Sequence, residues 1–169
     1  MRIKQPRNPT LIMSQAKPIP DGYEHATPHL ICRDTTQAIE FYKQAFAATE
    51  LYRIPMPDGK VGHAEIKIGG AIIMLADEFP DMGATSPQSL GGTPVSLMIY
   101  VADVDTFSAR AIAAGAKVIE PVKDQFYGDR SCKLSDPAGH VWMFATHTED
   151  VPPEEIAARA AKLFGGAPK

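Results

Sequence analysis

The chain has 169 residues, and 17 Lys and Arg against 20 Asp and Glu give it a net charge of −3. This length, with a hydrophobic content of 44%, predicts a globular protein with a real core and excludes general disorder. The acidic balance argues against a nucleic-acid partner, and no apolar run is long enough for a membrane span. Two cysteines are too few for a disulfide framework, so a cytoplasmic protein is expected.

Residues 1–24 are expected to form an N-terminal tail. The first 20 residues contain four prolines and four basic residues but no acidic residue. They lack the continuous apolar stretch of a secretory signal. Met13 is an alternative start to Met1.

Prolines and glycines divide the rest of the chain into two modules. The first covers residues 25–80, a Ser/Gly/Pro-rich linker covers 81–93, and the second covers 94–150. Residues 151–169 contain a last helix, Pro153–Phe164, which begins with Pro and two acidic residues.

The two modules are related by an internal repeat. Sliding the first by 96 − 27 = 69 residues places Thr27–Asp34 on Ser96–Asp103 and Gly70–Ala76 on Gly139–Ala145. These segments have the short apolar runs of strands. An unchanged offset at both ends means that the elements between them are equally long.

Each module is predicted to fold as β-α-β-β-β. Thr35–Ala47 and Val104–Ala114 have the apolar spacing of helices and follow the first strand of their modules. Turn sequences then separate three further strands in each module, at Asp58-Gly59, Gly69-Gly70, Gly128-Asp129 and Asp136–Gly139.

Three stretches of the sequence resemble a known family: PHLICRDTTQAIEFYKQAFAATEL, HAEIKIGGAIIMLADE and YGDRSCKLSDPAGHVWMFATHTEDVPPEE. The family is the vicinal-oxygen-chelate superfamily of glyoxalases, bleomycin-resistance proteins and extradiol dioxygenases, and more narrowly its bacterial PhnB-like group. The resemblance covers residues 25–160. It implies an α+β fold in which two tandem βαβββ modules form curled sheets around a cup, followed by a C-terminal helix, and it implies a homodimer.

The resemblance also implies where a metal would bind. In metal-dependent members each module supplies one ligand from its first strand and one from its last. These positions fall on Thr27 and Ser96, and on Met74 and Met143. Hydroxyl and thioether groups are poor ligands for a hard or borderline divalent ion. We therefore expect no metal and no other cofactor, which puts isomerase and dioxygenase chemistry in doubt.

Alternation along the strands predicts the lining of the cup. The candidate ligand-binding residues are His29, His63, Glu65, Met74, Met98, Tyr100, Tyr127, Arg130 and Met143. This largely apolar set is typical of a small-molecule site, and no catalytic residue can be assigned. The leading hypothesis is a protein that binds or sequesters a small organic ligand without a metal. The rival is a metal-dependent enzyme of the same superfamily, and a third hypothesis treats the protein as an interaction module that docks through Pro153–Phe164.

Several polar residues have two interpretations. His29, His63 and Glu65 could form a displaced metal site of a lyase, isomerase or dioxygenase, but we favour a His63 that supports the sheet and a Glu65 in solvent. Arg130 either clamps an anionic ligand or pairs with Asp129 to fix its turn. The remaining expectations are solvated Asp77 and Glu78, buried Cys32 and Cys132, an exposed His140, and a His147 without a partner.

Overall fold

The computed structural model describes residues 16–165, so the alternative starts at Met1 and Met13 lie outside the described residues. The strands form two four-stranded mixed sheets, in the orders β1-β4-β3-β2 and β5-β8-β7-β6. The strands are β1 His29–Cys32, β2 Thr49–Pro55, β3 Val61–Ile68, β4 Ala71–Asp77, β5 Ser96–Tyr100, β6 Lys117–Asp124, β7 Asp129–Ser135 and β8 Val141–His147. The α+β fold of two βαβββ modules is therefore confirmed.

One helix covers one face of each sheet. The helices are α1 Thr35–Phe46, the short α2 Pro87–Leu90, α3 Val104–Ala113 and α4 Pro153–Phe164. Asp34 and Asp103 cap α1 and α3, because their carboxylates accept the backbone N–H of Gln37 and Thr106. The expected linker is not a plain loop, since it contains α2 and a 3-10 turn at Pro80–Met82.

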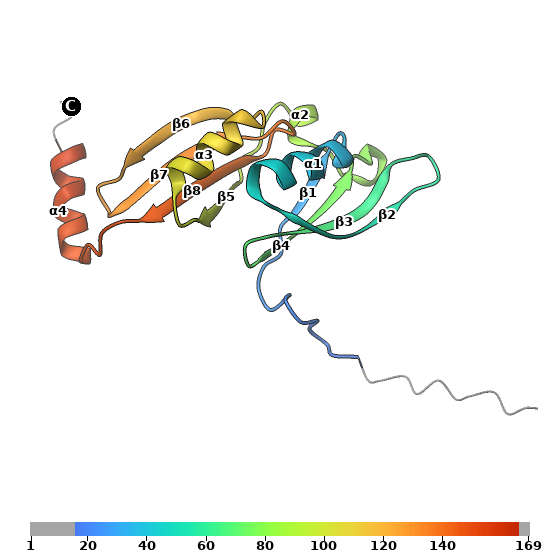
Figure 1. The fold of residues 1–169 in the computed structure, drawn as a ribbon, viewed down its shortest axis with the longest axis horizontal. Coiled ribbons are helices and arrows are strands. Elements are labelled where there is room, and N and C mark those ends of the chain that lie inside the picture. Colours follow the sequence, from blue (N-terminus) through green and yellow to red (C-terminus); the bar gives the residue numbers. More distant parts are fainter. Residues whose placement is uncertain (1–15, 166–169) are drawn as a thin grey trace, which may run out of the picture.

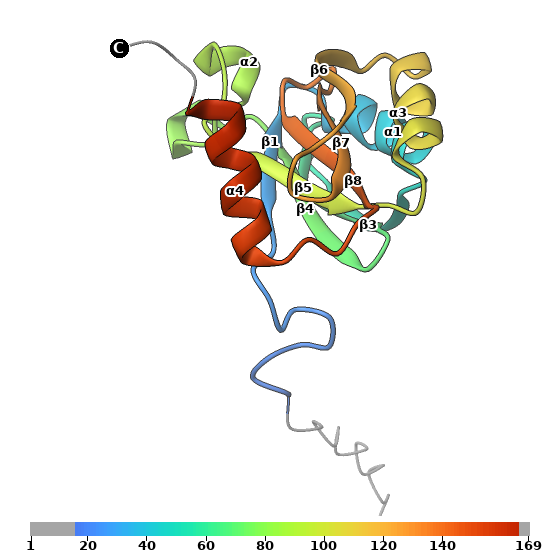
Figure 2. The ribbon, with the colours of Figure 1, turned by 90° about the vertical axis from the view of Figure 1, so that its left-hand side faces the viewer.

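The two modules lie side by side, with α1 and α3 next to each other on the same side of the sheets (Figures 1 and 2). The helices are joined by packing of Phe46 on Phe107, whose ring centroids are 5.7 Å apart. Arg110 Nε also donates to the carbonyl oxygen of Ala45 at 2.8 Å. This arrangement leaves the opposite face of each sheet free for a site.

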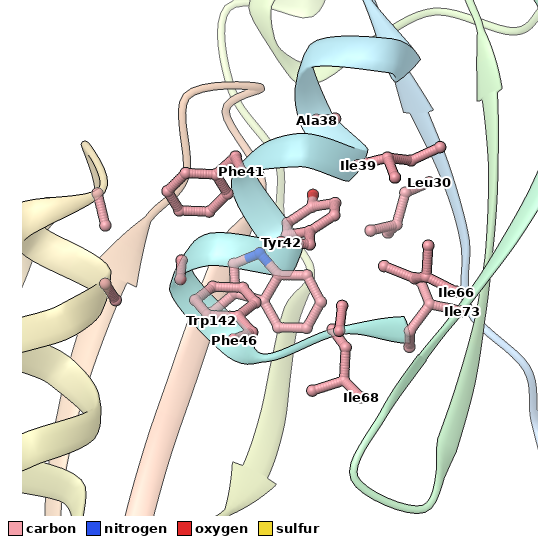
Figure 3. Packing of buried hydrophobic residues seen from close by; sticks show 14 of the residues in the cluster. Leu30, Ala38, Ile39, Phe41, Tyr42, Phe46, Ile66, Ile68, Ile73 and Trp142 are labelled. Atoms are coloured by element: carbon pink, nitrogen blue, oxygen red, sulfur yellow. The ribbon is translucent and has the colours of Figure 1, made fainter. Parts of the chain in front are cut away.

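The core lies between the helices and the sheets. Figure 3 shows Trp142 of β8 against Tyr42 and Phe46 of α1, so the aromatic core crosses from one module to the other. Asp136, which is 4% exposed, accepts hydrogen bonds from Tyr42 Oη at 2.6 Å and Trp142 Nε1 at 2.8 Å. A buried carboxylate with these donors fixes the orientation of the two modules.

Two expectations about polar residues are wrong. Asp77 is buried at the end of β4, where it accepts the backbone N–H of Thr35 at 2.6 Å and of Val61 at 2.7 Å. His140 is also buried, and its Nε2 lies 3.0 Å from the carbonyl oxygen of Ile31 in the other module. Both side chains satisfy backbone groups that have no strand or helix partner. No helix within residues 16–165 has the length and apolar character needed to cross a membrane.

Candidate functional site

The face of each sheet opposite its helix carries the candidate residues, and we call these surfaces the first and second cup faces. Cross-strand pairs place Glu65 between Tyr52 on β2 and Met74 on β4, and His29 on β1 lies beside Met74. In the second module Met98, Met143 and Lys133 form the corresponding row. Residues between these positions, such as Leu30, Ile66 and Leu134, point to the helices and are buried.

A buried carboxylate is the centre of the first cup face. Glu65 is 3% exposed, which corrects the interpretation that places it in solvent. Tyr52 Oη donates to its Oε1 at 2.9 Å, His63 Nε2 lies 3.3 Å from the same oxygen, and Tyr23 Oη donates to Oε2. Burial raises the pKa of Glu65, but the hydrogen bonds from Tyr23, Tyr52 and His63 outweigh it, so the pKa is lowered. Glu65 is therefore ionised at neutral pH.

A second buried carboxylate, Asp129, lies at the start of β7. It is 4% exposed, accepts a hydrogen bond from Tyr100 Oη at 2.7 Å, and lies 2.8 Å from His147 Nδ1. The other nitrogen of His147 faces Asp150 at 3.0 Å, so the expectation of a His147 without a partner is wrong. The hydrogen bond with Asp129, followed by that with Asp150, raises the pKa of His147.

Arg130 does not lie on a cup face. Its side chain points to α3, where Nε and Nη2 donate to the carboxylate of Asp105 at 2.7 and 2.8 Å, and Nη1 donates to Asp124 at 3.0 Å. The interpretation that pairs Arg130 with Asp129 is therefore wrong, because Arg130 pairs with Asp105 and Asp124. Its role as a clamp for an anionic ligand stays a prediction. Adjacent strand residues project to opposite faces, which separates Arg130 from Asp129.

The side chains at the positions of the family's metal ligands are not suited to binding the metal of its metal-dependent members. The register places His29 rather than Thr27 beside Met74, and Met98 rather than Ser96 beside Met143. Within residues 16–165 no three His, Cys, Asp or Glu side chains are placed to bind one ion. His29 and His63 have ring centroids 6.1 Å apart, and both oxygens of Glu65 accept tyrosine hydroxyls. We therefore derive no step through a metal.

Two pockets lie where the edges of the two sheets meet. One of about 280 Å³ is lined by His29, Ile31 and Leu97, among others. The other, of about 210 Å³, includes Thr27, Ile72 and Met98 in its lining. Tyr127 lies apart from both, in a shallow hollow with His147 and Ile156 near α4. A larger hollow of about 480 Å³ is lined by polar side chains of α1, such as Glu40 and Gln44, and none of the candidate residues lines it.

The two cysteines are packing residues, as expected. Cys32 and Cys132 are buried and free. Burial raises the pKa of both thiols, so neither supplies a thiolate at neutral pH.

Tyr23 and Tyr52 are the site residues that sequence reasoning missed. Alternation along β2 could have found Tyr52, because it faces Glu65 across the strand pair. No sequence pattern indicates Tyr23, which lies in a segment without regular structure and meets Glu65 across 42 positions of the chain.

The two βαβββ modules match a known family. Residues 22–144 match the family model of the Glyoxalase/Bleomycin resistance protein/Dioxygenase superfamily, and the chain belongs to that superfamily. It is 44% identical over 143 residues to the uncharacterized protein Rv0887c of Mycobacterium tuberculosis, covering 83% of this chain and 84% of that one.

Solved structures show the same fold. TioX from Micromonospora sp. ML1 is 29% identical with a TM-score of 0.60, over 73% of this chain and 98% of that chain. The fosfomycin resistance protein FosX from Listeria monocytogenes is 18% identical with a TM-score of 0.56, over 78% of this chain and 96% of that chain. The second likeness concerns the fold alone.

Proposed function

We propose that this protein binds a small organic ligand on its cup faces, without the metal used by other members of its superfamily. The observation that carries the proposal is the chemistry of the side chains across the second cup face. The row across the second cup face consists of Met98, Met143, Lys133 and Glu120; it offers no imidazole to a metal, and Lys133 lies 3.9 Å from Glu120, its one carboxylate. Methionine side chains adapt to ligands of many shapes, and the buried carboxylates supply a few fixed polar contacts.

A homodimer is part of this proposal. Met98 and Tyr100 on the second cup face are 41% and 60% exposed, and Tyr52 and Ile54 on the first are 46% and 51% exposed. Large apolar side chains gathered on one face are typical of surfaces that a partner covers. A second copy of the chain over these faces would enclose a ligand from both sides. The PhnB-like assignment and a cytoplasmic location stay predictions from the sequence.

The test combines elemental analysis with a ligand screen followed by methionine-methyl NMR. Protein purified without a chelator or a nickel column is expected to contain far less than one divalent ion per chain. Compounds that raise the melting temperature are expected to shift the methyl signals of Met74, Met98 and Met143. Met82, which is 75% exposed in the linker, is the internal control.

One divalent ion per chain that is required for ligand binding would overturn the metal-free proposal. It would favour the displaced site of His29, His63 and Glu65, for which the observation is the 3.3 Å separation of His63 Nε2 and Glu65 Oε1. In that case His63→Ala is expected to abolish both metal content and turnover. Sedimentation of a monomer at all concentrations would overturn the dimer.

A further inference from the structure

Glu65 is a buried negative charge with no Lys or Arg beside it in the described part of the chain. Within residues 16–165 it forms no ion pair with any Lys or Arg, and its only titratable ion-pair partner is His63. The other groups that face it are neutral phenol hydroxyls. Glu50 on the neighbouring strand β2 differs, since Lys43 and Arg53 both pair with it. A desolvated carboxylate that lacks such a cation attracts one strongly.

One oxygen of Glu65 is covered by a group that can leave. Oε1 is held by Tyr52 and His63, which belong to strands, whereas Oε2 has Tyr23 as its only partner among the described residues. Loss of the hydrogen bond to Tyr23 therefore frees Oε2 but leaves the carboxylate oriented.

Residues 16–24 belong to no helix or strand and run away from the sheets beside β4 (Figures 1 and 2). Apart from the bond between Tyr23 and Glu65, the hydrogen bonds of this described segment are local. They join Lys17 to Asp21, the N–H of Gly22 to Glu24, and the N–H of Tyr23 to the carbonyl of Pro20. Displacing Tyr23 therefore breaks no strand pairing.

We infer that Glu65 is the binding site for a cationic group of the ligand, a protonated amine or a quaternary ammonium, and that Tyr23 is the removable cover of this site. The inference rests on the proposed function and names its ligand class. The cation replaces the Tyr23 hydroxyl at Oε2 and forms the ion pair that no Lys or Arg of residues 16–165 supplies.

The surroundings of Glu65 suit an organic cation with an apolar body. The rings of Tyr52 and His63 are 5.7 Å apart, and those of His63 and His29 are 6.1 Å apart, so aromatic side chains flank the carboxylate. Aromatic faces attract ammonium groups. The lining of the pocket of about 210 Å³ includes Ile72, which lies two residues along β4 from Met74, the neighbour of Glu65. An apolar body attached to the cation can extend into it.

The test compares three small aromatic probes that differ in charge: benzylamine, which is protonated at neutral pH, benzyl alcohol and benzoate. Each is titrated into the full chain, and the methyl signal of Met74 reports binding. Benzylamine is expected to bind most tightly. Glu65→Gln is expected to lower the affinity for benzylamine by about tenfold and to leave the affinity for benzyl alcohol almost unchanged.

Tyr23→Phe provides a second variant that leaves the sheets intact. This variant is expected to raise the affinity for benzylamine by about threefold, because the cation no longer competes with the hydroxyl of Tyr23 for Glu65. Glu50→Gln is the matched control, since it neutralises a carboxylate on the helix side of the same sheet, and the affinity for benzylamine should not change.

Equal affinity for all three probes, no binding of benzylamine, or an unchanged affinity in both Glu65→Gln and Tyr23→Phe would overturn the inference. None of these results bears on the proposed function, which the compound screen decides. Neutral or anionic hits that shift the methionine signals would leave a small-molecule protein whose ligand is not a cation.

Discussion

Glu65 in the first module and Asp129 in the second are both buried carboxylates that accept a tyrosine hydroxyl and lie beside a histidine nitrogen. They occupy different positions, however. The residue at the position of Glu65 in the second module is Lys133, because each pairs with the corresponding methionine, Met74 or Met143. The internal repeat therefore preserved the backbone but not the charge at the centre of the cup face.

The partners of the two carboxylates differ in how firmly they are held. Tyr100 and His147 belong to β5 and β8, so Asp129 is locked within the sheet. Tyr23 belongs to no element, so Glu65 is covered by a side chain that can move. A carboxylate covered by regular structure therefore supports the fold, whereas one covered by an irregular segment can be reached by a ligand.

A parallel contrast exists in the residues that anchor the modules. At the end of the last strand, Asp77 in the first module and Thr146 in the second each accept the first N–H of a helix, from Thr35 and Val104. The turn before that strand is Gly69-Gly70 in the first module. In the second it contains Asp136, which bonds to the first module through Tyr42. The second module therefore supplies the junction.

The largest effect is expected from breaking this junction. Asp136→Ala leaves the donors of Tyr42, Trp142 and His140 N–H without their acceptor inside the core. We expect a loss of roughly 3–5 kcal/mol in the free energy of unfolding, measured in urea. Asp124→Ala, at an exposed position on β6, is the matched control and should leave the midpoint unchanged. A small effect of Asp136→Ala would show that the aromatic packing between the modules, and not the buried carboxylate, joins them.

A smaller effect is expected from the strand-end anchors. Asp77→Ala removes the acceptor of two buried backbone N–H groups, from Thr35 and Val61, and is expected to cost about 2–3 kcal/mol. Thr146→Val removes one acceptor and is expected to cost about 1 kcal/mol. Urea titrations of both variants measure the difference. Equal losses would mean that the carboxylate and the hydroxyl are equivalent anchors.

The fold was predictable because its signals are local and repeated. Residues 153–164 form the helix expected from their Pro and acidic start, and the helix of the first module differs from its prediction by one residue. The offset of 69 residues pairs Met74 with Met143, and the strand registers give both the same place beside the first strand of their module. The expectation that Cys32 is buried also holds, since it is 0% exposed.

The site was less predictable because its contacts are distant or depend on orientation. Tyr23 reaches Glu65 from a proline-rich tail, and His140 reaches Ile31 across 109 positions, contacts that no local pattern contains. The error at Arg130 was avoidable. Adjacent residues of a strand face opposite sides, so Arg130 and Asp129 could not form one cluster.

Removing the C-terminal helix should change little. Only the second module carries such an extension, and α4 has no buried residue. Its contacts with the second module include the packing of Phe164 on Phe126, the ion pair of Arg159 with Glu149 and a hydrogen bond from Arg159 to the carbonyl oxygen of Phe126. Deleting residues 153–169 is expected to leave the midpoint of urea unfolding unchanged. The oligomeric state, measured by sedimentation velocity, is also expected to stay the same. A change of oligomeric state would instead support an interaction role for α4.

The smallest expected difference between the modules is in the pKa of one histidine from each, His29 in the first and His147 in the second. Hydrogen bonds that the carboxylates of Asp129 and then Asp150 accept raise the pKa of His147, whereas partial burial and then the neighbouring His63 lower the pKa of His29. Both start from an ordinary value of about 6.5. NMR titration of the ring protons should therefore show His29 losing its proton at lower pH than His147.

The two histidines therefore change the stability of the folded state in opposite directions as the pH rises. A raised pKa means that protonated His147 stabilises the folded state below its unfolded pKa, and this contribution is lost as the pH rises through the folded value. A lowered pKa means that protonation of His29 opposes folding, so its contribution grows as the pH rises. In Asp129→Asn the pKa of His147 should fall toward that of His29. If it does not, Asp150 alone holds the proton, and the buried carboxylate of the second module is coupled only to Tyr100.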